Sequence, residues 1–220
     1  FAQGWIRDYG TNFYAGHEVE QASNNDFISC GRGNNTAYYQ RVNTLGDTLW
    51  TTNLSYNQAG ALAVDMLLLQ DGSLVSVNQK GTAAVVVKLN AAGQLLFQNE
   101  WNWSSDISPT SIVEADSGFY VMGAISSTGS DTDLFLAKTD ANGDTLWMKT
   151  YGGANNEFAS DMALTSDGGV VLTGETILDS SGTNVRYMYV IKTDAQGNEM
   201  WQRSLNNGDY AWYGNAVTTT

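Results

Sequence analysis

A ten-residue pattern recurs along the chain and constrains its fold more than any other feature. The clearest copy is residues 138–147, KTDANGDTLW, and further copies begin at Arg41, Lys88 and Lys192. Each copy reads as a strand that ends in a basic residue, a tight turn with glycine, and a second strand that carries an aromatic residue. These aromatic anchors are Trp5, Trp50, Phe97, Trp147 and Trp201. Their spacing of roughly 45 to 54 residues is typical of a repeated structural unit.

A second landmark precedes each anchor and divides the unit further. Residues 167–174, DGGVVLTG, are matched by 116–123, DSGFYVMG, and more weakly by 71–78 and 24–31. Each reads as a hairpin turn followed by a strand. Together with the flanking segments, this predicts four short strands per repeat, in the ranges 11–54, 55–103, 104–153 and 154–208.

Four antiparallel strands in a period of 40–50 residues are typical of β-propeller blades. The competing interpretation is a β-solenoid, whose coils are shorter and would not need two hairpin turns per unit. No window shows sustained helical periodicity with caps, so we expect almost no helix. The sequence therefore predicts an all-β protein with four whole blades.

Partial blades are expected at both ends. Residues 1–10 read as the last strand of a preceding blade, and residues 209–220 as the first strand of a following one. A closed ring avoids exposed sheet edges, and propellers often complete one blade from both termini. Here the two partial blades together would still lack two strands. We expect either that further blades follow Thr220 or that a partner chain supplies a strand.

Composition narrows the possible partners. The chain has 23 acidic and 10 basic residues, a formal charge of −13. Such a chain repels polyphosphate, which argues against nucleic-acid binding and leaves cations, neutral sugars and basic protein surfaces. The sequence contains no run of about 18 apolar residues, so it predicts no membrane-spanning segment. The single Cys30 cannot form an internal disulfide, and its strand-like neighbours suggest a small core residue.

Three stretches resemble a known family. They are residues 167–176, DGGVVLTGET, residues 191–201, IKTDAQGNEMW, and residues 151–153, YGG. The pattern is similar to β-propeller repeats of large secreted proteins of Bacteroidota-type bacteria, which resemble cargo of the type IX secretion route. The resemblance implies a β-propeller fold and a secreted or cell-surface location, and it implies no particular reaction.

Two other propeller motifs share the position of this turn but not its spacing. Tryptophan-docking repeats look similar, yet the interval from Asp140 to Trp147 is one residue shorter here. The Asp-box places its glycine two residues after the aspartate, whereas Gly143 follows Asp140 by three. The shared physics is that an aromatic residue at this point packs between adjacent blades. We therefore interpret the five anchors as structural docks, each contributing roughly 2–3 kcal/mol by burial.

The turn at 140–144, DANGD, also invites a calcium interpretation. An EF-hand loop would place its glycine sixth and a glutamate twelfth, and position twelve here is Tyr151. The sister turns replace candidate ligands with Leu45, Ala92 and Gln94. A turn explains all four copies, so we predict no metal or other cofactor.

Charged residues fall at two repeated levels. Alignment on the turns places Glu18, Asp65, Thr110 and Asp161 on the first strand of each unit, which lines the channel of a propeller. The same alignment places Arg41, Lys88, Lys138 and Lys192 on the third strand. These groups are either solvated or paired, or the acids form a carboxylate-lined channel mouth that concentrates cations.

The sequence offers little for catalysis. His17 is the only histidine, which excludes a histidine triad or a multi-histidine metal site within these residues. Acid pairs such as Glu18 and Glu20 are common in an acidic chain and do not indicate a glycosidase alone. Aromatic residues outside the repeat register are candidates for ligand binding or for packing between blades. They are Trp103, Tyr210 and Trp212.

The function we predict is a non-enzymatic secreted or cell-surface propeller that binds or displays a protein or glycan. One alternative is a carbohydrate-active or quinone-dependent propeller enzyme whose catalytic residues lie outside these 220 residues. Another is a scaffold completed by a partner strand.

Overall fold

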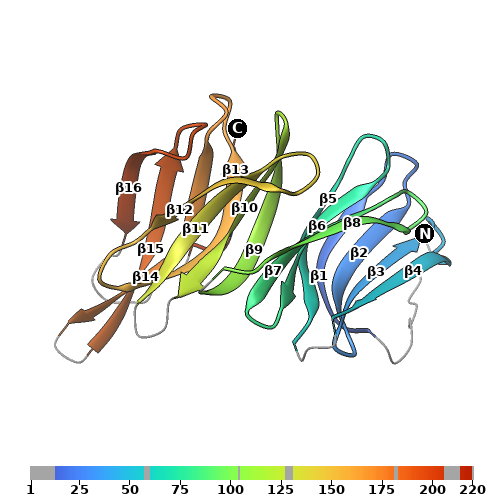
Figure 1. The fold of residues 1–220 in the computed structure, drawn as a ribbon, viewed down its shortest axis with the longest axis horizontal. Coiled ribbons are helices and arrows are strands. Elements are labelled where there is room, and N and C mark those ends of the chain that lie inside the picture. Colours follow the sequence, from blue (N-terminus) through green and yellow to red (C-terminus); the bar gives the residue numbers. More distant parts are fainter. Residues whose placement is uncertain are drawn as a thin grey trace, which may run out of the picture. The chain divides into compact units, whose positions relative to one another are not determined.

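The structure is a computed structural model that describes residues 13–56, 60–103, 105–126, 131–180, 183–205 and 214–219. Within these ranges the chain forms β-strands joined by turns and contains no helix (Figure 1). The described strands build four antiparallel sheets of four strands each, ordered as in the sequence. The predicted all-β class with four-stranded repeats is therefore confirmed.

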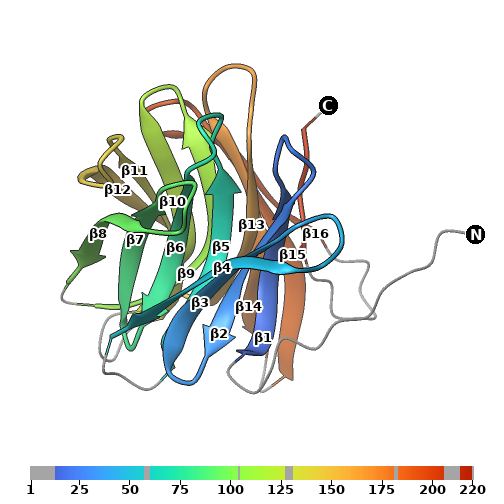
Figure 2. The ribbon, with the colours of Figure 1, turned by 90° about the vertical axis from the view of Figure 1, so that its right-hand side faces the viewer.

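The first compact unit, Phe1–Trp101, contains two of these sheets (Figure 2). The first sheet comprises β1 (Phe13–Gln21), β2 (Phe27–Gly33), β3 (Thr36–Val42) and β4 (Thr48–Ser55). The second comprises β5 (Leu62–Leu68), β6 (Leu74–Lys80), β7 (Ala83–Leu89) and β8 (Leu95–Trp101). β5 packs against β1, β2 and β3, and side chains such as Tyr39, Met66 and Leu89 form the shared core.

The second compact unit, Asn102–Thr220, repeats this arrangement. Its first sheet comprises β9 (Asp106–Ala115), β10 (Gly118–Ser126), β11 (Thr132–Thr139) and β12 (Thr145–Tyr151). Its second comprises β13 (Asn156–Leu164), β14 (Val170–Ser180), β15 (Thr183–Thr193) and β16 (Glu199–Leu205). β13 packs against β9, β10 and β11, around a core that includes Tyr120, Met122 and Leu172.

Burial explains the residue pattern of each strand. The middle strands β6 and β7 are buried on both faces for most of their length. β7 reads as a nearly continuous apolar run, whereas β6 also buries the polar residues Ser76 and Asn78. The fourth strands β4 and β8 alternate between exposed and half-buried residues, as strands at a sheet border do. β16 differs, because all seven of its residues are exposed.

The turn after each third strand has one geometry in all four sheets. In the copy at 140–144, the Oδ1 atom of Asp140 accepts hydrogen bonds from the backbone N–H of Asn142 at 2.8 Å and of Asp144 at 3.0 Å. Asn43, Asn90 and Asp194 make the same two bonds in their turns. The glycines that follow have φ of 79°, 77°, 79° and 72°, a region that favours glycine; they are Gly46, Gly93, Gly143 and Gly197.

The first strand of every sheet contains a β-bulge at the same level. The extra residues are His17, Val64, Thr110 and Ser160. The residues that follow the bulge pair with the second strand, and they are Glu18, Asp65, Ser111 and Asp161. The expected alignment is therefore corrected at one position: Ser111, and not Thr110, is the equivalent of the three acids. A bulge inserts one unpaired residue into a strand, and the residue types do not reveal its position.

A buried polar network joins the two sheets of the first unit. The Tyr39 hydroxyl donates to Oδ1 of Asn78 at 2.7 Å, and the Ser76 hydroxyl donates to the same atom at 2.8 Å. The Asn78 amide in turn donates to the Tyr56 hydroxyl at 2.7 Å. Asn78 has no exposed surface, so these bonds replace those it would make with water.

Residues 214–219 lie beside β13 and β14 without forming a strand. The N–H of Gly214 donates to the carbonyl of Gly174 at 3.2 Å, and the N–H of Val217 donates to Asp161 at 2.9 Å. The expected strand over 209–220 thus has no ladder within its described part, and its other residues lie outside the described ranges. The expected strand over 1–10 also lies outside them.

Candidate functional site

Two of the aromatic anchors pack on the turn of the next sheet. In the first unit, a Cβ added at Gly93 would lie 2.7 Å from ring atoms of Trp50, and the Trp50 indole N–H donates to the Ala91 carbonyl at 3.1 Å. In the second unit, a Cβ at Gly197 would lie 2.7 Å from Cζ3 of Trp147. Each indole therefore covers a turn glycine of the following blade.

The other three anchors are placed differently. Phe97 is half-buried, and Trp201 on β16 keeps 41% of its surface exposed. Trp5 lies outside the described residues. The structure thus places Trp50 and Trp147 at contacts between consecutive sheets, and the docking role of the remaining three stays a prediction.

The acids at the bulge level have local backbone partners. Glu18, Asp65 and Asp161 each accept a hydrogen bond from the N–H of the next residue, at 3.0, 2.8 and 2.8 Å. Asp161 also accepts bonds from the Ser111 hydroxyl at 3.4 Å and from the Val217 N–H at 2.9 Å. These carboxylates therefore stabilise the bulges, and channel lining stays a prediction.

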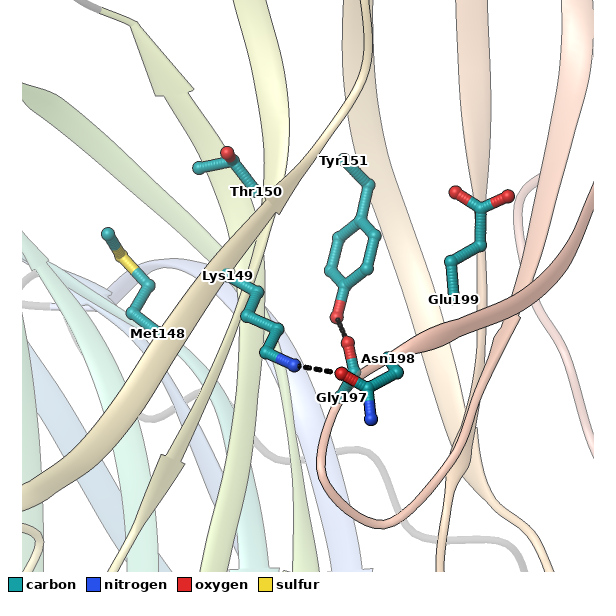
Figure 3. A pocket seen from close by; sticks show the side chains of 7 residues that line it. All are labelled: Met148, Lys149, Thr150, Tyr151, Gly197, Asn198 and Glu199. Atoms are coloured by element: carbon teal, nitrogen blue, oxygen red, sulfur yellow. Dashed lines mark hydrogen bonds between the residues drawn. The ribbon is translucent and has the colours of Figure 1, made fainter.

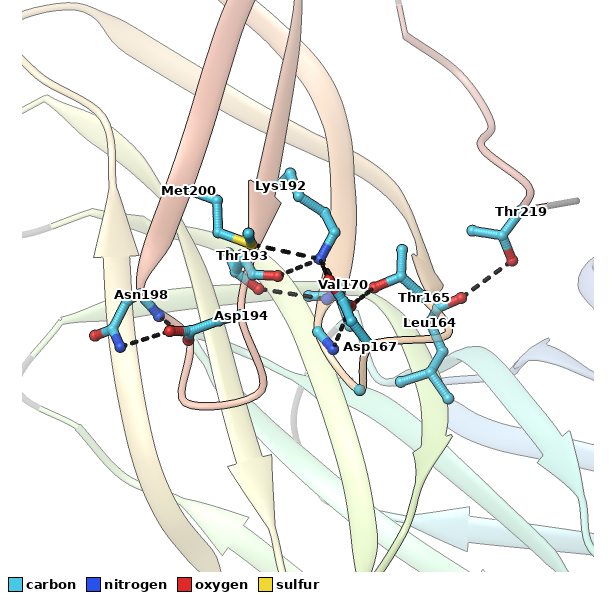
Figure 4. Close-up of polar contacts among 12 residues, drawn as sticks. Leu164, Thr165, Asp167, Val170, Lys192, Thr193, Asp194, Asn198, Met200 and Thr219 are labelled. Carbon is cyan, nitrogen blue, oxygen red and sulfur yellow. Dashed lines mark hydrogen bonds and ion pairs between the residues drawn. The ribbon is translucent and has the colours of Figure 1, made fainter.

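Three basic residues of the third strands, Arg41, Lys138 and Lys192, contact an acid or an aromatic ring. Arg41 contacts Asp26 at 3.0 Å, and Lys192 contacts Asp167 at 2.9 Å (Figure 4). The Lys138 ammonium lies 5.1 Å from the centre of the Tyr120 ring. The Thr165 hydroxyl, followed by Lys192, holds the pKa of Asp167 well below its usual value. These groups fix the strands to their turns.

Of the three candidate ligand-binding aromatics, Trp103 alone lies within the described residues. Trp103 is half-buried and meets Phe135 edge to face, with 5.8 Å between ring centres. Tyr210 and Trp212 lie outside the described residues. Trp103 therefore contributes to packing in the second unit, and its role in ligand binding stays a prediction.

His17 and Cys30, the single histidine and the single cysteine, do not lie at a common site. His17 is exposed on the bulge of β1, whereas Cys30 on β2 is fully buried. Burial raises the pKa of the Cys30 thiol far above its usual value, which keeps it protonated. Cys30 behaves as a small core residue.

An open groove of about 500 Å³ runs between β12 and the turn from β15 to β16 (Figure 3). The Lys149 ammonium crosses it to Oδ1 of Asn198 at 2.6 Å, and the Tyr151 hydroxyl donates to the Gly197 carbonyl at 2.7 Å. Met148 and Glu199 border it. These two hydrogen bonds join consecutive blades. The Lys149 ammonium and the Tyr151 hydroxyl of the groove are therefore already paired within the protein.

A pair of carboxylates in the second unit is the feature that sequence reasoning missed. Asp133 on β11 and Glu157 on β13 converge above Gly152, where an added Cβ would overlap both side chains. Desolvation raises the pKa of each carboxyl group, and the negative charge of Asp131 raises both further. The signal in the sequence was the glycine after Tyr151, which leaves space for the two acids.

A small pocket of about 160 Å³ opens beside this pair. Glu157 lines it together with Thr176, Tyr189, Gln202 and Ser204. The Thr176 hydroxyl donates to Oε1 of Glu157 at 2.7 Å. The pocket is therefore polar, and its single charged wall is acidic.

The described residues contain neither a metal-ligand cluster nor a helix that could span a membrane. No group of three or more His, Cys, Asp and Glu side chains within the described ranges could hold a metal ion. In the same part of the chain, no helix has the length and apolar character of a membrane span.

Comparison with solved structures shows the fold. A protein of unknown function from Bacteroides caccae is 14% identical with a TM-score of 0.50, over 86% of this chain and 81% of that one. A GH43 glycoside hydrolase engineered to display endo-xylanase and exo-arabinofuranosidase activity is 13% identical with a TM-score of 0.53, over 94% of this chain. The match spans 44% of that enzyme, so this chain corresponds to less than half of its length.

The four-stranded sheets and these neighbours define the class of the protein as a β-propeller. No family model matches the sequence, and no curated protein matches it.

Proposed function

We propose that the chain is a non-enzymatic β-propeller module that binds or displays a protein at the cell surface. The observation that supports this is a repeated exposed aliphatic residue on the outermost strand of each sheet. The residue before each described anchor is 51%, 56%, 58% and 58% exposed; these residues are Leu49, Leu96, Leu146 and Met200. Large apolar side chains exposed at one repeated position favour a contact surface.

The strands that carry these residues support the same proposal. β4, β8, β12 and β16 each stand at the end of their sheet order. Within the described residues they are sheet edges, whose free backbone groups suit an added strand. The ligand class we propose is therefore a protein segment, with a glycan as the alternative.

A fourfold variant tests the proposal: Leu49→Thr, Leu96→Thr, Leu146→Thr and Met200→Thr together. Val19→Thr is the matched control, because Val19 is 59% exposed but lies on the first strand, β1. We expect immobilised wild type and control to retain the same cell-surface protein, and the fourfold variant to lose it. Equal retention by the folded fourfold variant, or binding on a glycan array alone, would contradict a protein-binding outer surface.

The location is proposed on the resemblance of the repeats to secreted Bacteroidota-type proteins. Secretion by a type IX route would place the module outside the cell, where an acidic surface aids solubility. Protease treatment of intact native cells tests this location. We expect the module to be cleaved before a cytoplasmic marker, and full protection until lysis would refute export.

Carbohydrate cleavage is the second candidate, since one neighbour is a glycoside hydrolase. The acid pair is the observation that bears on it. Retaining enzymes hold their two carboxyl groups roughly 5 Å apart, and inverting enzymes hold them farther apart. Asp133 and Glu157 crowd one position above Gly152, so no sugar fits between them. We expect no release of reducing sugar from arabinoxylan by this chain.

A further inference from the structure

We propose that a pocket between the two sheets of the first unit binds a neutral saccharide. The pocket has a volume of about 330 Å³ and lies between the ends of β1 and β5 and the turns that follow these strands. None of its lining residues belongs to an outermost strand, so the site is separate from the proposed display surface. The inference therefore stands independently of the proposed function.

Two turns with the same hydrogen-bond pattern border the pocket. In the first, the N–H of Ala22 donates to the carbonyl of Asp26 at 2.8 Å, and in the second, the N–H of Leu69 donates to the carbonyl of Ser73 at 2.8 Å. β1 and β5 pack against each other, which places both turns beside the pocket. Because these backbone groups are bonded within their own turns, the pocket offers mainly side chains to a ligand.

Several polar side chains of the pocket have no hydrogen-bond partner among the described residues. They are the carboxylate of Glu20, the amides of Gln21 and Gln70 and the hydroxyl of Ser23, which together provide both donors and acceptors. Desolvation, followed by the charge of Glu18, raises the pKa of Glu20. Glu20 has therefore lost part of its water without gaining a partner, and a ligand with hydroxyl groups can supply one.

Arg41 adds donors of fixed geometry to the wall of the pocket. Its Nε atom donates to Asp26 at 3.0 Å, Nη1 to the Ala91 carbonyl at 3.2 Å and Nη2 to the Asn24 side chain at 3.1 Å. A guanidinium has five N–H donors and these bonds use three, so two remain without a partner in the described part of the chain. The three bonds hold the guanidinium in place before a ligand binds, which lowers the entropic cost of binding.

The charges at the pocket favour a ligand without net charge. The ion pair with Asp26 at 3.0 Å reduces the attraction of Arg41 for an anion, and Glu20 repels one. A cation that approaches Glu20 would meet the guanidinium of Arg41 in the same pocket. An ion of either sign therefore encounters a like charge.

A saccharide fits these groups better than another neutral ligand. Each sugar hydroxyl can both donate and accept, so neighbouring hydroxyls can donate to Glu20 and accept from Arg41 or from an amide. Hydrogen bonds to a charged group are stronger than those between neutral groups. The half-buried Leu68 supplies an apolar contact for the C–H groups of a sugar ring. A peptide that adds a strand would need unpaired backbone groups, and the two turns use theirs internally.

The size of the pocket limits the length of the saccharide. Pockets for small molecules have volumes of roughly 300–1,000 Å³. The volume of about 330 Å³ lies at the lower end of this range. We therefore expect a mono- or disaccharide, or the end of a longer chain, to occupy the pocket.

Calorimetric titration of the whole chain with cellobiose, maltose, lactose and mannobiose tests the site. The site variants are Glu20→Gln and Gln70→Ala. Their matched controls are Glu114→Gln on β9 and Gln98→Ala on β8, which change exposed residues outside the pocket. We expect saturable binding of at least one disaccharide by wild type and both controls, and a loss of affinity of at least about tenfold in each site variant.

The thermal midpoint provides a second readout. The side chains of Glu20 and Gln70 make no hydrogen bond to the described residues, so neither site variant should lower the midpoint without saccharide. The bound disaccharide should raise the midpoint of wild type and controls but not that of the site variants. A loss of binding at an unchanged midpoint thus separates a role in binding from a role in folding.

Three results would overturn the proposal. The first is no saturable binding of any of the four disaccharides by wild type up to about 10 mM, tenfold above millimolar affinity. The second is unchanged binding by both folded site variants. The third is tighter binding of galacturonic acid or glycine than of every neutral disaccharide, because the pocket would then recognise an anion or a zwitterion.

Discussion

At the scale of single residues, two turn glycines are difficult to replace. Gly93 and Gly197 combine a positive φ with an indole ring that occupies the space of a side chain. Gly168 has a similar φ of 79°, but a Cβ there would meet only the Ala195 methyl, at 3.5 Å. Substitution of Gly168 therefore tests the backbone conformation alone. Substitution of Gly93 or Gly197 tests the backbone conformation together with the packing of the indole.

Alanine substitution at these glycines should therefore have unequal effects. Gly168→Ala carries the backbone cost alone, about 1–2 kcal/mol. Gly197→Ala must also displace Trp147, which adds about 1–3 kcal/mol of overpacking. Denaturant titration of both variants measures the difference. Equal destabilisation would mean that Trp147 moves aside without loss.

The Asp167 carboxylate should make stability depend on pH. Its pKa is lowered in the folded state, so its contribution is complete above the unfolded value and is lost as the pH falls through the folded value. The thermal midpoint of Asp167→Asn should fall below that of wild type at neutral pH, and the gap should close in strong acid. Asp116→Asn changes the corresponding acid of the preceding sheet and serves as the control. A gap that persists unchanged at low pH would contradict a charge effect.

At the scale of elements, buried polar bonds hold one sheet to the next. The Tyr39 hydroxyl of β3 reaches Asn78 of β6, so this bond links strands of different sheets. Trp50 and Trp147 link fourth strands to following turns through ring packing on a glycine. Sheet contacts in each unit therefore combine apolar packing with specific bonds that fix the register between blades.

Removing the hub of the polar network should be costly. Asn78→Leu leaves the hydroxyls of Tyr39 and Ser76 without their acceptor and Tyr56 without its donor. We expect a loss of about 3 kcal/mol or more, from two to three unsatisfied groups. Tyr56→Phe removes one bond at the half-buried margin and should cost about 1 kcal/mol. Urea unfolding of both variants measures the two losses of stability. Equal losses would show that water replaces the hydrogen-bond partners that Asn78 provides.

The strand order and turns could be predicted because they follow local rules. The Asx side chain and the glycine of 140–144 specify the turn by themselves, and apolar runs specify the middle strands. The bulge after Pro109 could not be placed, since Thr110 and Ser111 are chemically alike and only pairing distinguishes them. Asp133 and Glu157 belong to different sheets, so packing alone reveals their proximity.

At the scale of the whole molecule, charge opposes compactness. The chain has a formal charge of −13, and several acids lie close to one another in the second unit. Self-repulsion of this kind acts over distances set by the ionic strength. The stability of the folded chain should therefore respond to salt independently of any specific ligand.

Raising sodium chloride from about 0.01 M to about 1 M shortens the screening length from about 30 Å to about 3 Å. We expect the thermal midpoint to rise across this range, because repulsion among like charges is screened. Scanning calorimetry with calcium removed by chelator measures the effect, and sucrose of matched osmolality controls for excluded solute. A constant or falling midpoint would show that the ion pairs of Arg41 and Lys192 outweigh the repulsion.

The contact between an indole and the next turn glycine also bears on how such a chain can change its length. The second repeat contains both Gly93, which receives Trp50, and the anchor Phe97; the fourth contains both Gly197, which receives Trp147, and the anchor Trp201. With Phe97 and Trp201 docking as their register predicts, a duplicated repeat carries a donor half and an acceptor half of the same joint. Gene-level gain or loss of one repeat would preserve matching surfaces on either side, as in other nearest-neighbour arrays.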